Sequence, residues 1–401
     1  MSKGLRRLIQ TGHIADASFD PCGFARAHGA FGVRNYLLIL NLTGLTEMAA
    51  RRAADQLSGA VFVSFPYGMG MVGDDLAAST RMLTGLATNP NIGAIVFVSA
   101  DRSRLTEIAE ASADAATPSE EVCLDAVGHD AVTLTSEIVQ AGAKLMREAS
   151  FGKRSKLKLS DLCIGVECGL SDTSSGIAAN RVVGGVTDQV VAAGGTVIMG
   201  ETLEWLGVEN QLADRAETKE VASAICNAVA RRENRARSEG VDLLGINPNR
   251  RNIEEGLSTI EEKASGSIAK SGSAPITGLL DHGEAPTRPG LWLMDQPSYS
   301  PESLTGYAAA GAQIALFTTG SGNSYTSAIM PTIKVTANTK TARTRDTQID
   351  FDCSPVMTGA DLKAAVSDLL EQVFKVASGM LTFGEILGEG NEVFSRFGEA
   401  L

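Results

Sequence analysis

The chain has 401 residues, of which 44% are hydrophobic and 20% charged, and its net charge is −12. This length exceeds the roughly 250 to 300 residues at which a single hydrophobic core stops growing, so we expect two domains. The acidic balance excludes a general nucleic-acid surface, which would need clustered Lys and Arg. No stretch approaches the about 20 apolar residues of a membrane span, and residues 1–13 lack the apolar core of a signal peptide, so we expect a cytoplasmic protein without membrane contact.

Short apolar runs alternate with amphipathic stretches in the first part of the chain. The predicted strands are 36–42, 61–65, 92–98 and 121–127, and the predicted helices are 47–57, 76–87, 104–113 and 131–149. This alternation predicts a doubly wound parallel sheet. We therefore expect an N-terminal extension over 1–22 and a first, flavodoxin-like α/β domain over 23–155, with residues 151–160 crossing to the next domain.

A second series of strands and helices begins at Leu162 and predicts a second α/β domain over 156–401. Its predicted strands are 162–166, 196–199, 290–294, 313–318 and 332–336, and its predicted helices are 177–193, 217–237, 254–264, 301–310 and 360–378. The fold class expected for the whole chain is two doubly wound, mostly parallel α/β domains.

Polar loops follow several predicted strands of the second domain. Ligands of a doubly wound sheet bind beyond the carboxyl ends of the strands, so these loops would meet along one edge. Their acidic residues are Glu167, Asp172, Glu201, Glu204 and Asp295. Such carboxylates could ligate a divalent cation or act as a general base, and the alternative is that several of them only cap helices.

The densest of these loops is 167–180, which reads Glu-Cys-Gly-Leu-Ser-Asp-Thr-Ser-Ser-Gly-Ile-Ala-Ala-Asn. It follows an apolar run and leads into a helix whose free N–H groups can face a ligand. A site is favoured by the density of reactive side chains. In the competing interpretation, Ser171 and Asp172 cap the helix and Cys168 is a small buried hydrophobe.

Three further features could bind an anionic substrate. The loop 318–324 is rich in glycine and hydroxyl groups and could cradle a carboxylate or phosphate, although a plain turn is the alternative. Lys263 and Lys270 flank a Gly-Ser-rich segment. Arg34 could clamp a carboxylate if the fold brings the amino end of the first strand to the site. No nucleotide fingerprint is present, so no nucleotide is expected.

A collinear series of motifs runs from about Gly23 to the C-terminus. It consists of Gly32-Val33-Arg34-Asn35, Glu167-Cys168-Gly169-Leu170-Ser171-Asp172, Ser175-Gly176-Ile177-Ala178-Ala179-Asn180, Glu201-Thr202, Asn247-Pro248, Met294-Asp295-Gln296-Pro297, Phe317-Thr318-Thr319-Gly320 and Ile333-Lys334-Val335-Thr336-Ala337-Asn338-Thr339. In this order the motifs resemble the altronate dehydratase and D-galactarate dehydratase family, whose relatives include the large subunit of sulfolactate sulfo-lyase. The resemblance implies metal-dependent β-elimination of water from aldonic acids or sugar diacids, giving 2-keto-3-deoxy acids, or of sulfite from sulfolactate.

The chain departs from that family in two places. The first-domain segments in which relatives carry cysteines and a histidine read Tyr67-Gly68-Met69-Gly70-Met71 and Ser99-Ala100-Asp101-Arg102-Ser103 here, and thioether or guanidinium groups cannot replace thiolates as iron ligands. A glycine-rich turn of the relatives is replaced by Asn249-Arg250-Arg251-Asn252. Relatives also often carry a small β-rich domain or a separate small subunit, which implies a small β-rich partner subunit for this chain, in an oligomer.

The loops and the resemblance together assign the site. The catalytic candidates are Glu167, Asp172 and Glu201, and Cys168 and Asp295 are the candidate ligands of divalent iron, manganese or magnesium. The candidate substrate-binding residues are Arg34, Asn35, Ser171, Ser175, Lys270, Thr318, Thr319, Ser321 and Asn338. The expected function is a hydro-lyase acting on a small hydroxy acid. The alternatives are a sulfo-lyase acting on sulfolactate, and a catalytically diverged member that binds an acidic metabolite or serves as a scaffold subunit.

Overall fold

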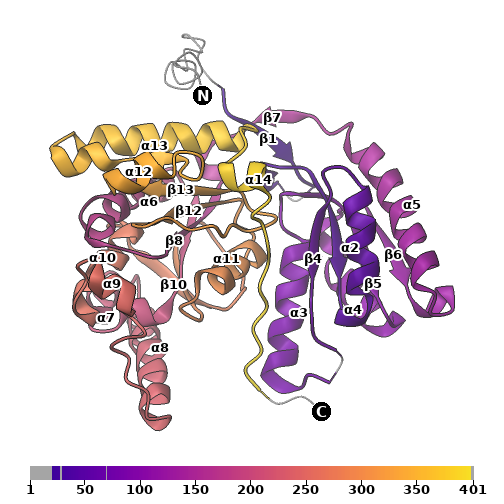
Figure 1. The fold of residues 1–401 in the computed structure, drawn as a ribbon, viewed down its shortest axis with the longest axis horizontal. Coiled ribbons are helices and arrows are strands. Elements are labelled where there is room, and N and C mark those ends of the chain that lie inside the picture. The colour runs from indigo at the N-terminus through magenta and orange to yellow at the C-terminus, as the bar shows by residue number, and fades with distance from the viewer. Residues whose placement is uncertain (1–19, 28, 69, 399–401) are drawn as a thin grey trace.

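The computed structural model describes residues 20–27, 29–68 and 70–398, which form two parallel α/β domains and a small antiparallel sheet (Figure 1). The first domain contains a four-stranded sheet in the order β4-β3-β5-β6, and the second a seven-stranded sheet in the order β10-β11-β9-β8-β12-β13-β14. Neighbouring strands within both sheets are parallel. The predicted fold class is confirmed.

Helices cover both faces of the first sheet. Its elements are β3 (Tyr36–Asn41), α2 (Glu47–Gln56), β4 (Val61–Ser64), α3 (Gly73–Ala87), β5 (Ile92–Ser99), α4 (Arg102–Ala111), β6 (Ser119–Cys123) and α5 (Ala131–Ala149). Leu37 and Ile39 of β3 pack with α2 and α5, whereas Leu38 and Leu40 pack with α3 and α4. This division follows from the strand period of two, because both faces are apolar.

The second domain is larger. Its strands are β8 (Cys163–Cys168), β9 (Thr196–Met199), β10 (Ile276–Asp281), β11 (Gly290–Asp295), β12 (Ile314–Thr318), β13 (Thr332–Thr336) and β14 (Phe351–Asp352). Its helices are α6 (Asn180–Ala192), α7 (Glu209–Ala213), α8 (Lys219–Ser238), α9 (Arg250–Glu254), α10 (Ile260–Ile268), α11 (Ser300–Ala309), α12 (Thr339–Thr344), α13 (Leu362–Ala377) and α14 (Phe383–Leu387). Helices α6 and α13 pack on one face of the sheet and α11 on the other. Among the described helices, none has the length and apolarity that a membrane crossing requires.

One hydrophobic core joins the two domains. Leu83 of α3 and Leu304 of α11 belong to the same buried cluster, which also contains side chains from both sheets. The helices approach closely at Gly85, where a Cβ would lie 2.1 Å from the Ala309 carbonyl oxygen. The buried amide of Asn91 donates to the carbonyls of Gln313 and Ile329 across the same boundary. The domains therefore pack as closely as the interior of either one.

Some elements were not predicted from the sequence. Strands β1 (Cys22–Ala25), β2 (Phe31–Gly32) and β7 (Arg154–Lys156) form the small antiparallel sheet, so the expected crossing at 151–160 contributes a strand. These strands are too short to show an alternating pattern. Strand β10 was also missed, because it contains Gly278, where a Cβ would lie 2.4 Å from the ring of Trp292.

The helix predicted over 254–264 is wrong in its bounds, because two helices, α9 and α10, occupy this region. Gly256 between them has a φ of +99°, which a helix cannot contain. The Thr259 side chain then accepts a hydrogen bond from the Glu262 N–H and starts α10.

The last described residues leave the second domain and cross to the first as an extended coil (Figure 1, yellow segment that runs toward the C label). The ring of Phe394 packs edge-on against Phe65, with 5.1 Å between the ring centroids. The backbone N–H groups of Phe397 and Gly398 donate to the carboxylate of Asp75 at the start of α3. In space, this segment belongs to the first domain.

We expect Phe394→Ala to lower the free energy of unfolding by about 3 kcal/mol, because the Phe394 ring is 7% exposed and its removal leaves a cavity. Urea denaturation followed by fluorescence measures the change. Phe397→Ala is the matched control, since that ring is 62% exposed, and it should change the stability by less than about 0.5 kcal/mol. Equal effects of the two variants would contradict the packing described for the segment.

Candidate active site

The carboxyl ends of four strands lie together at one edge of the large sheet. The strand register pairs Val166 with Met199, Met199 with Leu293, and Cys168 with Thr318. Chain connections turn from one side of the sheet to the other at β8, and such switch points are where doubly wound sheets bind ligands. A cavity of about 470 Å³ opens there. Its ionisable and thiol lining groups are those of Cys168, Glu201, Glu204, Lys263, Tyr299 and Tyr325.

Two buried carboxyls form a pair at the ends of β8 and β9. Tyr307 donates its hydroxyl to Glu167 Oε2 at 2.9 Å, and the backbone N–H of Cys168 donates to Oε1 at 3.0 Å. The carboxyls of Glu167 and Glu201 are close enough for each to perturb the pKa of the other. Burial raises the pKa of Glu167 to about 6, and burial together with the charge of Glu167 raises the pKa of Glu201 well above its usual value. Burial therefore favours retention of a proton on this pair, and Glu201 is the member whose pKa is raised well above its usual value.

Only one member of this pair, Glu201, lines the cavity. Its backbone is left-handed, with a φ of +64°, which costs a non-glycine residue about 1 kcal/mol or more. The preceding Gly200 is required by packing, because a Cβ there would lie 1.9 Å from Gln296 Nε2. The Gly200 N–H donates to the Tyr307 hydroxyl at 2.6 Å, so the same tyrosine holds both halves of the carboxyl pair.

A second buried carboxylate, that of Glu204, is surrounded by donors. Lys263 Nζ donates to Oε1 at 2.7 Å, and Lys270 Nζ lies 3.3 Å from Oε2, which also accepts hydrogen bonds from the Ser267 hydroxyl and, at 3.0 Å, from the Cys168 thiol. Burial alone would raise the pKa of Glu204, but the charges of Lys263 and Lys270 outweigh it and lower this pKa. Burial raises the pKa of the Cys168 thiol, and the charge of Glu204 raises it further.

Three side chains of this cluster could hold a metal ion. Donor atoms of Cys168, Glu201 and Glu204 lie within 4.8 Å of one another, and all three residues are buried. Two carboxylates and a thiolate fit a divalent transition metal and would leave coordination positions open for a substrate. An ion bound there would compete with Lys270, whose Nζ lies 3.2 Å from Cys168 Sγ.

The structure does not bring Asp295 or Arg34 to this cavity. Asp295, a candidate metal ligand, is paired with Arg231 and Arg232 of α8. Arg34 forms a buried ion pair with Glu385 at 2.7 Å, which ties α14 to the first domain. The neighbouring Asn35 accepts a hydrogen bond from Arg26 and donates one to the Ala149 carbonyl. These side chains are engaged within the fold.

Asp172 has the geometry of a helix cap. Its Oδ1 accepts hydrogen bonds from the Ser174 hydroxyl and from the N–H and hydroxyl of Ser175, and its Oδ2 accepts one from the Asn338 amide at 2.7 Å. This arrangement fits the capping alternative, and Asp172 also lines the second cavity described below, so its catalytic role stays a prediction. Ser175 and Asn338 thus hold the loop and do not line the cavity.

Internal hydrogen bonds also engage some of the hydroxyl groups of the glycine-rich loop, residues 318–324. Thr318 donates its hydroxyl to Asn180 Oδ1, and the Thr319 hydroxyl accepts from the Gly322 N–H. The hydroxyls of Ser171 and Ser321 differ, because both are buried and have no hydrogen-bond partner among the residues that the structure describes. Of the predicted substrate-binding hydroxyl groups, these two remain available to a ligand.

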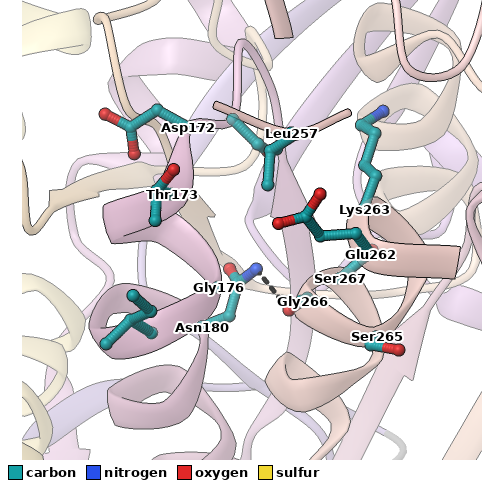
Figure 2. Close-up of a pocket in the computed structure, with 12 residues that line it drawn as sticks. Asp172, Thr173, Gly176, Asn180, Leu257, Glu262, Lys263, Ser265, Gly266 and Ser267 are labelled. Atoms are coloured by element: carbon teal, nitrogen blue, oxygen red, sulfur yellow. Dashed lines mark hydrogen bonds between the residues drawn. The ribbon is translucent and has the colours of Figure 1, made fainter. Parts of the chain in front are cut away.

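A second cavity of about 300 Å³ adjoins the cluster, between the turn that begins α6 and helix α10 (Figure 2). Figure 2 shows the side chain of Asn180, the first residue of α6, bonded to the Gly266 carbonyl. The distance between the two atoms is 2.7 Å. Gly176 and Gly266 touch, since a Cβ on either would lie 3.1 Å from the Cα of the other. Residues 175–179 form a π-helical turn, a feature frequent at functional sites.

Sequence reasoning missed Ser267 and Tyr307. Tyr307 lies inside α11, where its spacing is that of a core residue, and no local signal distinguishes it. A signal exists for Ser267, because Lys263, Ser267 and Lys270 are spaced i, i+4 and i+7 and so share one helix face.

Buried acids at the switch point of a doubly wound sheet are typical of α/β enzymes. Residues 23–150 match the family model described as D-galactarate dehydratase/Altronate hydrolase, second domain, and residues 159–399 match D-galactarate/Altronate dehydratase, C-terminal. The chain belongs to the D-galactarate and altronate dehydratase family, as predicted.

Relatives with these domains are named as lyases. A (2R)-sulfolactate sulfo-lyase subunit beta from Chromohalobacter salexigens is 34% identical, and the match covers 94% of this chain and 97% of that protein. Altronate dehydratase from Bacillus subtilis is 29% identical over 90% of this chain and 74% of its own length, and galactarate dehydratase (L-threo-forming) from Escherichia coli is 30% identical over 65% and 50%. These activities break carbon–oxygen or carbon–sulfur bonds, which confirms the predicted lyase class.

We expect Lys270→Met to lower the free energy of unfolding by about 3 kcal/mol, because it leaves buried Glu204 with a single ammonium partner. Urea denaturation of Lys270→Met, Glu204→Gln and the double variant measures the coupling. The double variant should be more stable than Lys270→Met alone. Full stability of Lys270→Met would contradict the ion-pair account.

Proposed function

We propose that this chain catalyses β-elimination from a small hydroxy acid bound in the 470 Å³ cavity. The observation that carries the proposal is the buried carboxyl pair of Glu167 and Glu201, because Glu201 lines that cavity beside Glu204 and burial favours retention of a proton on the pair. Elimination requires a proton acceptor at the carbon next to a carboxylate and a proton donor at the leaving group. A carboxyl pair that shares one proton can serve as both.

The proton transfers balance within the pair. With the shared proton held on Glu167, the Glu201 carboxylate, which lines the cavity, accepts the proton α to the substrate carboxylate. The electrons of that C–H bond form the carbon–carbon double bond as the β C–O bond breaks. Glu201 then passes the proton it accepted to the departing hydroxyl, which leaves as water, and Glu167 keeps the shared proton. The pair again holds one proton, and the enol product tautomerises to a 2-keto-3-deoxy acid. Glu201 is the member that would contact the substrate, and Glu167 is a positioning residue.

Charge stabilisation supports the same chemistry. Removal of the α-proton places a second negative charge on the substrate carboxylate, and the ammonium of Lys263 lines the cavity. A divalent ion held by Cys168, Glu201 and Glu204 would supply Lewis-acid stabilisation of that charge. Such an ion needs an ionised Glu201, so its affinity should rise with pH.

A second candidate is elimination of sulfite from sulfolactate. It is favoured by the relative named a sulfolactate sulfo-lyase subunit, which matches this chain over nearly the full length of both. Sulfite leaves as a stable anion and needs no proton from Glu201. We also propose a small partner subunit, because that relative is itself named as one subunit of its enzyme.

The test is release of 2-keto acid or sulfite by the purified chain, alone and with a candidate small subunit. Aldonates, aldarates and sulfolactate are assayed with iron, manganese or magnesium, and bound metal is measured by mass spectrometry. Keto-acid formation with water loss supports the first candidate, and sulfite release from sulfolactate selects the second. No metal and no turnover under any condition would reject the lyase proposal and leave the binding or scaffold alternative.

The pH dependence follows from the carboxyl pair. Below about pH 6 Glu167 also becomes protonated, so the pair loses its proton acceptor, and kcat for dehydration should fall as the pH decreases through that value. The measurement is the steady-state rate between pH 4.5 and about 8.5. A rate that is flat from pH 5 to about 8 would contradict the assignment.

A substitution tests the same assignment. Glu201→Gln should lower kcat by at least about 100-fold, because an amide cannot accept the α-proton. Glu220→Gln, on the exposed side of α8, is the matched control and should leave kcat unchanged. Full activity of Glu201→Gln would remove Glu201 from the proton-transfer step.

A further inference from the structure

We propose that the substrate of this site is a dianion whose second anionic group, a carboxylate or sulfonate, binds in a separate arginine pocket next to the elimination cavity. This inference rests on the proposed function. The pocket has a volume of about 310 Å³, and Arg251, Arg345, Ser321 and Asn323 contribute to its lining.

The arginine pocket adjoins the elimination cavity. Leu170 and Asn323 line both spaces. The Leu170 carbonyl accepts hydrogen bonds from the N–H groups of Gly320 and Ser321, at 3.2 and 3.4 Å, which joins the loop after β8 to the glycine-rich loop after β12. A molecule in the larger cavity therefore has the arginine pocket beside it, at the turn around Leu170.

The arginine pocket offers positive charge without a carboxylate of its own. Neither Arg251 nor Arg345 has an ion-pair partner among residues 20–27, 29–68 and 70–398, whereas the adjacent Arg250 is paired with Glu254. Ser321 is 8% exposed, and within the described part of the chain its buried hydroxyl has no hydrogen-bond partner. A buried polar group without a partner costs about 1–3 kcal/mol, which a ligand oxygen would recover.

Local backbone geometry positions one of the two guanidinium groups. Gly322 has a φ of +93°, and a Cβ there would lie 2.6 Å from Arg345 Cδ. The Arg345 side chain thus lies directly over the glycine-rich loop. Any other residue at 322 would push this side chain away from Ser321, which explains the glycine.

The second arginine lies on an element that is fixed to the elimination site. Helix α9 contributes Asn252 to the larger cavity and Arg251 to the arginine pocket. The Asn252 amide donates to the Ser171 carbonyl at 2.8 Å, so α9 is tied to the loop that carries Glu167.

The chemistry of the arginine pocket selects among candidate acids. A guanidinium fork binds carboxylate and sulfonate oxygens through paired hydrogen bonds. Aldarates and sulfolactate carry an anionic group at each end, whereas an aldonate ends in an uncharged hydroxymethyl group. An aldonate would leave both arginines without an anionic partner. The substrate class favoured is therefore a dicarboxylate or a carboxylate–sulfonate.

The test compares calorimetric binding of an aldarate, the aldonate of the same configuration, and sulfolactate. The wild-type chain, with the small subunit and metal it needs, should bind at least one dianion about tenfold or more tightly than the aldonate. Arg251→Gln and Arg345→Gln should each remove most of this preference and change aldonate binding by less than about twofold. Arg250→Gln is the matched control, because its side chain is paired with Glu254, and should keep the preference.

Equal binding of aldarate, sulfolactate and aldonate, no binding of any acid, or the same loss in Arg250→Gln would overturn the inference. Binding does not require turnover, so the two proposals can fail separately. Tight dianion binding without any elimination would reject the proposed function alone. Turnover of the aldonate with a kcat/KM equal to that of both dianions would reject the arginine pocket alone.

Discussion

The site depends on the balance of charge in a buried cluster. The Glu204 carboxylate is paired with the ammonium groups of Lys263 and Lys270, which lower its pKa, whereas burial raises the pKa values of Glu167 and Glu201. Buried ions persist only when they are paired. Removal of one charged member of this cluster would therefore leave its partner as an unpaired charge in an apolar environment. This requirement fixes β8, the turn after β9 and helix α10 relative to one another.

The first domain supports this cluster through packing. Helix α3 packs against α11, and α11 carries Tyr307, whose hydroxyl orients Glu167 and meets the Gly200 N–H. The buried pair of Arg34 and Glu385 holds the two domains together from the other side. The first-domain loops lack the thiols that the family resemblance implies. The first domain nevertheless supports the site, because its helix α3 packs against α11, which carries Tyr307.

The sequence predicted the two-domain α/β fold well, because buried parallel strands are continuous apolar runs and helices have their own period. The strands beginning at Tyr36, Cys163 and Thr332 were expected within about two residues. Strands β1, β2, β7 and β10 were missed for a physical reason. Edge strands and very short strands are stabilised by pairing with a distant segment. Their own residues show no alternation of apolar and polar side chains from which a strand could be predicted.

From its residues alone, the chain determined its family, its lyase class and the sheet edge at which Glu167, Cys168 and Glu201 would meet, since these follow from local patterns and from ordered motifs. Tertiary structure alone decided which polar groups face a ligand. Arg34 and Asp295 form ion pairs, and Asp172 caps a helix. Ser321 and Arg345 instead line the arginine pocket, where a ligand can reach them. Whether a polar side chain is satisfied depends on neighbours hundreds of residues away, and no local pattern records those neighbours.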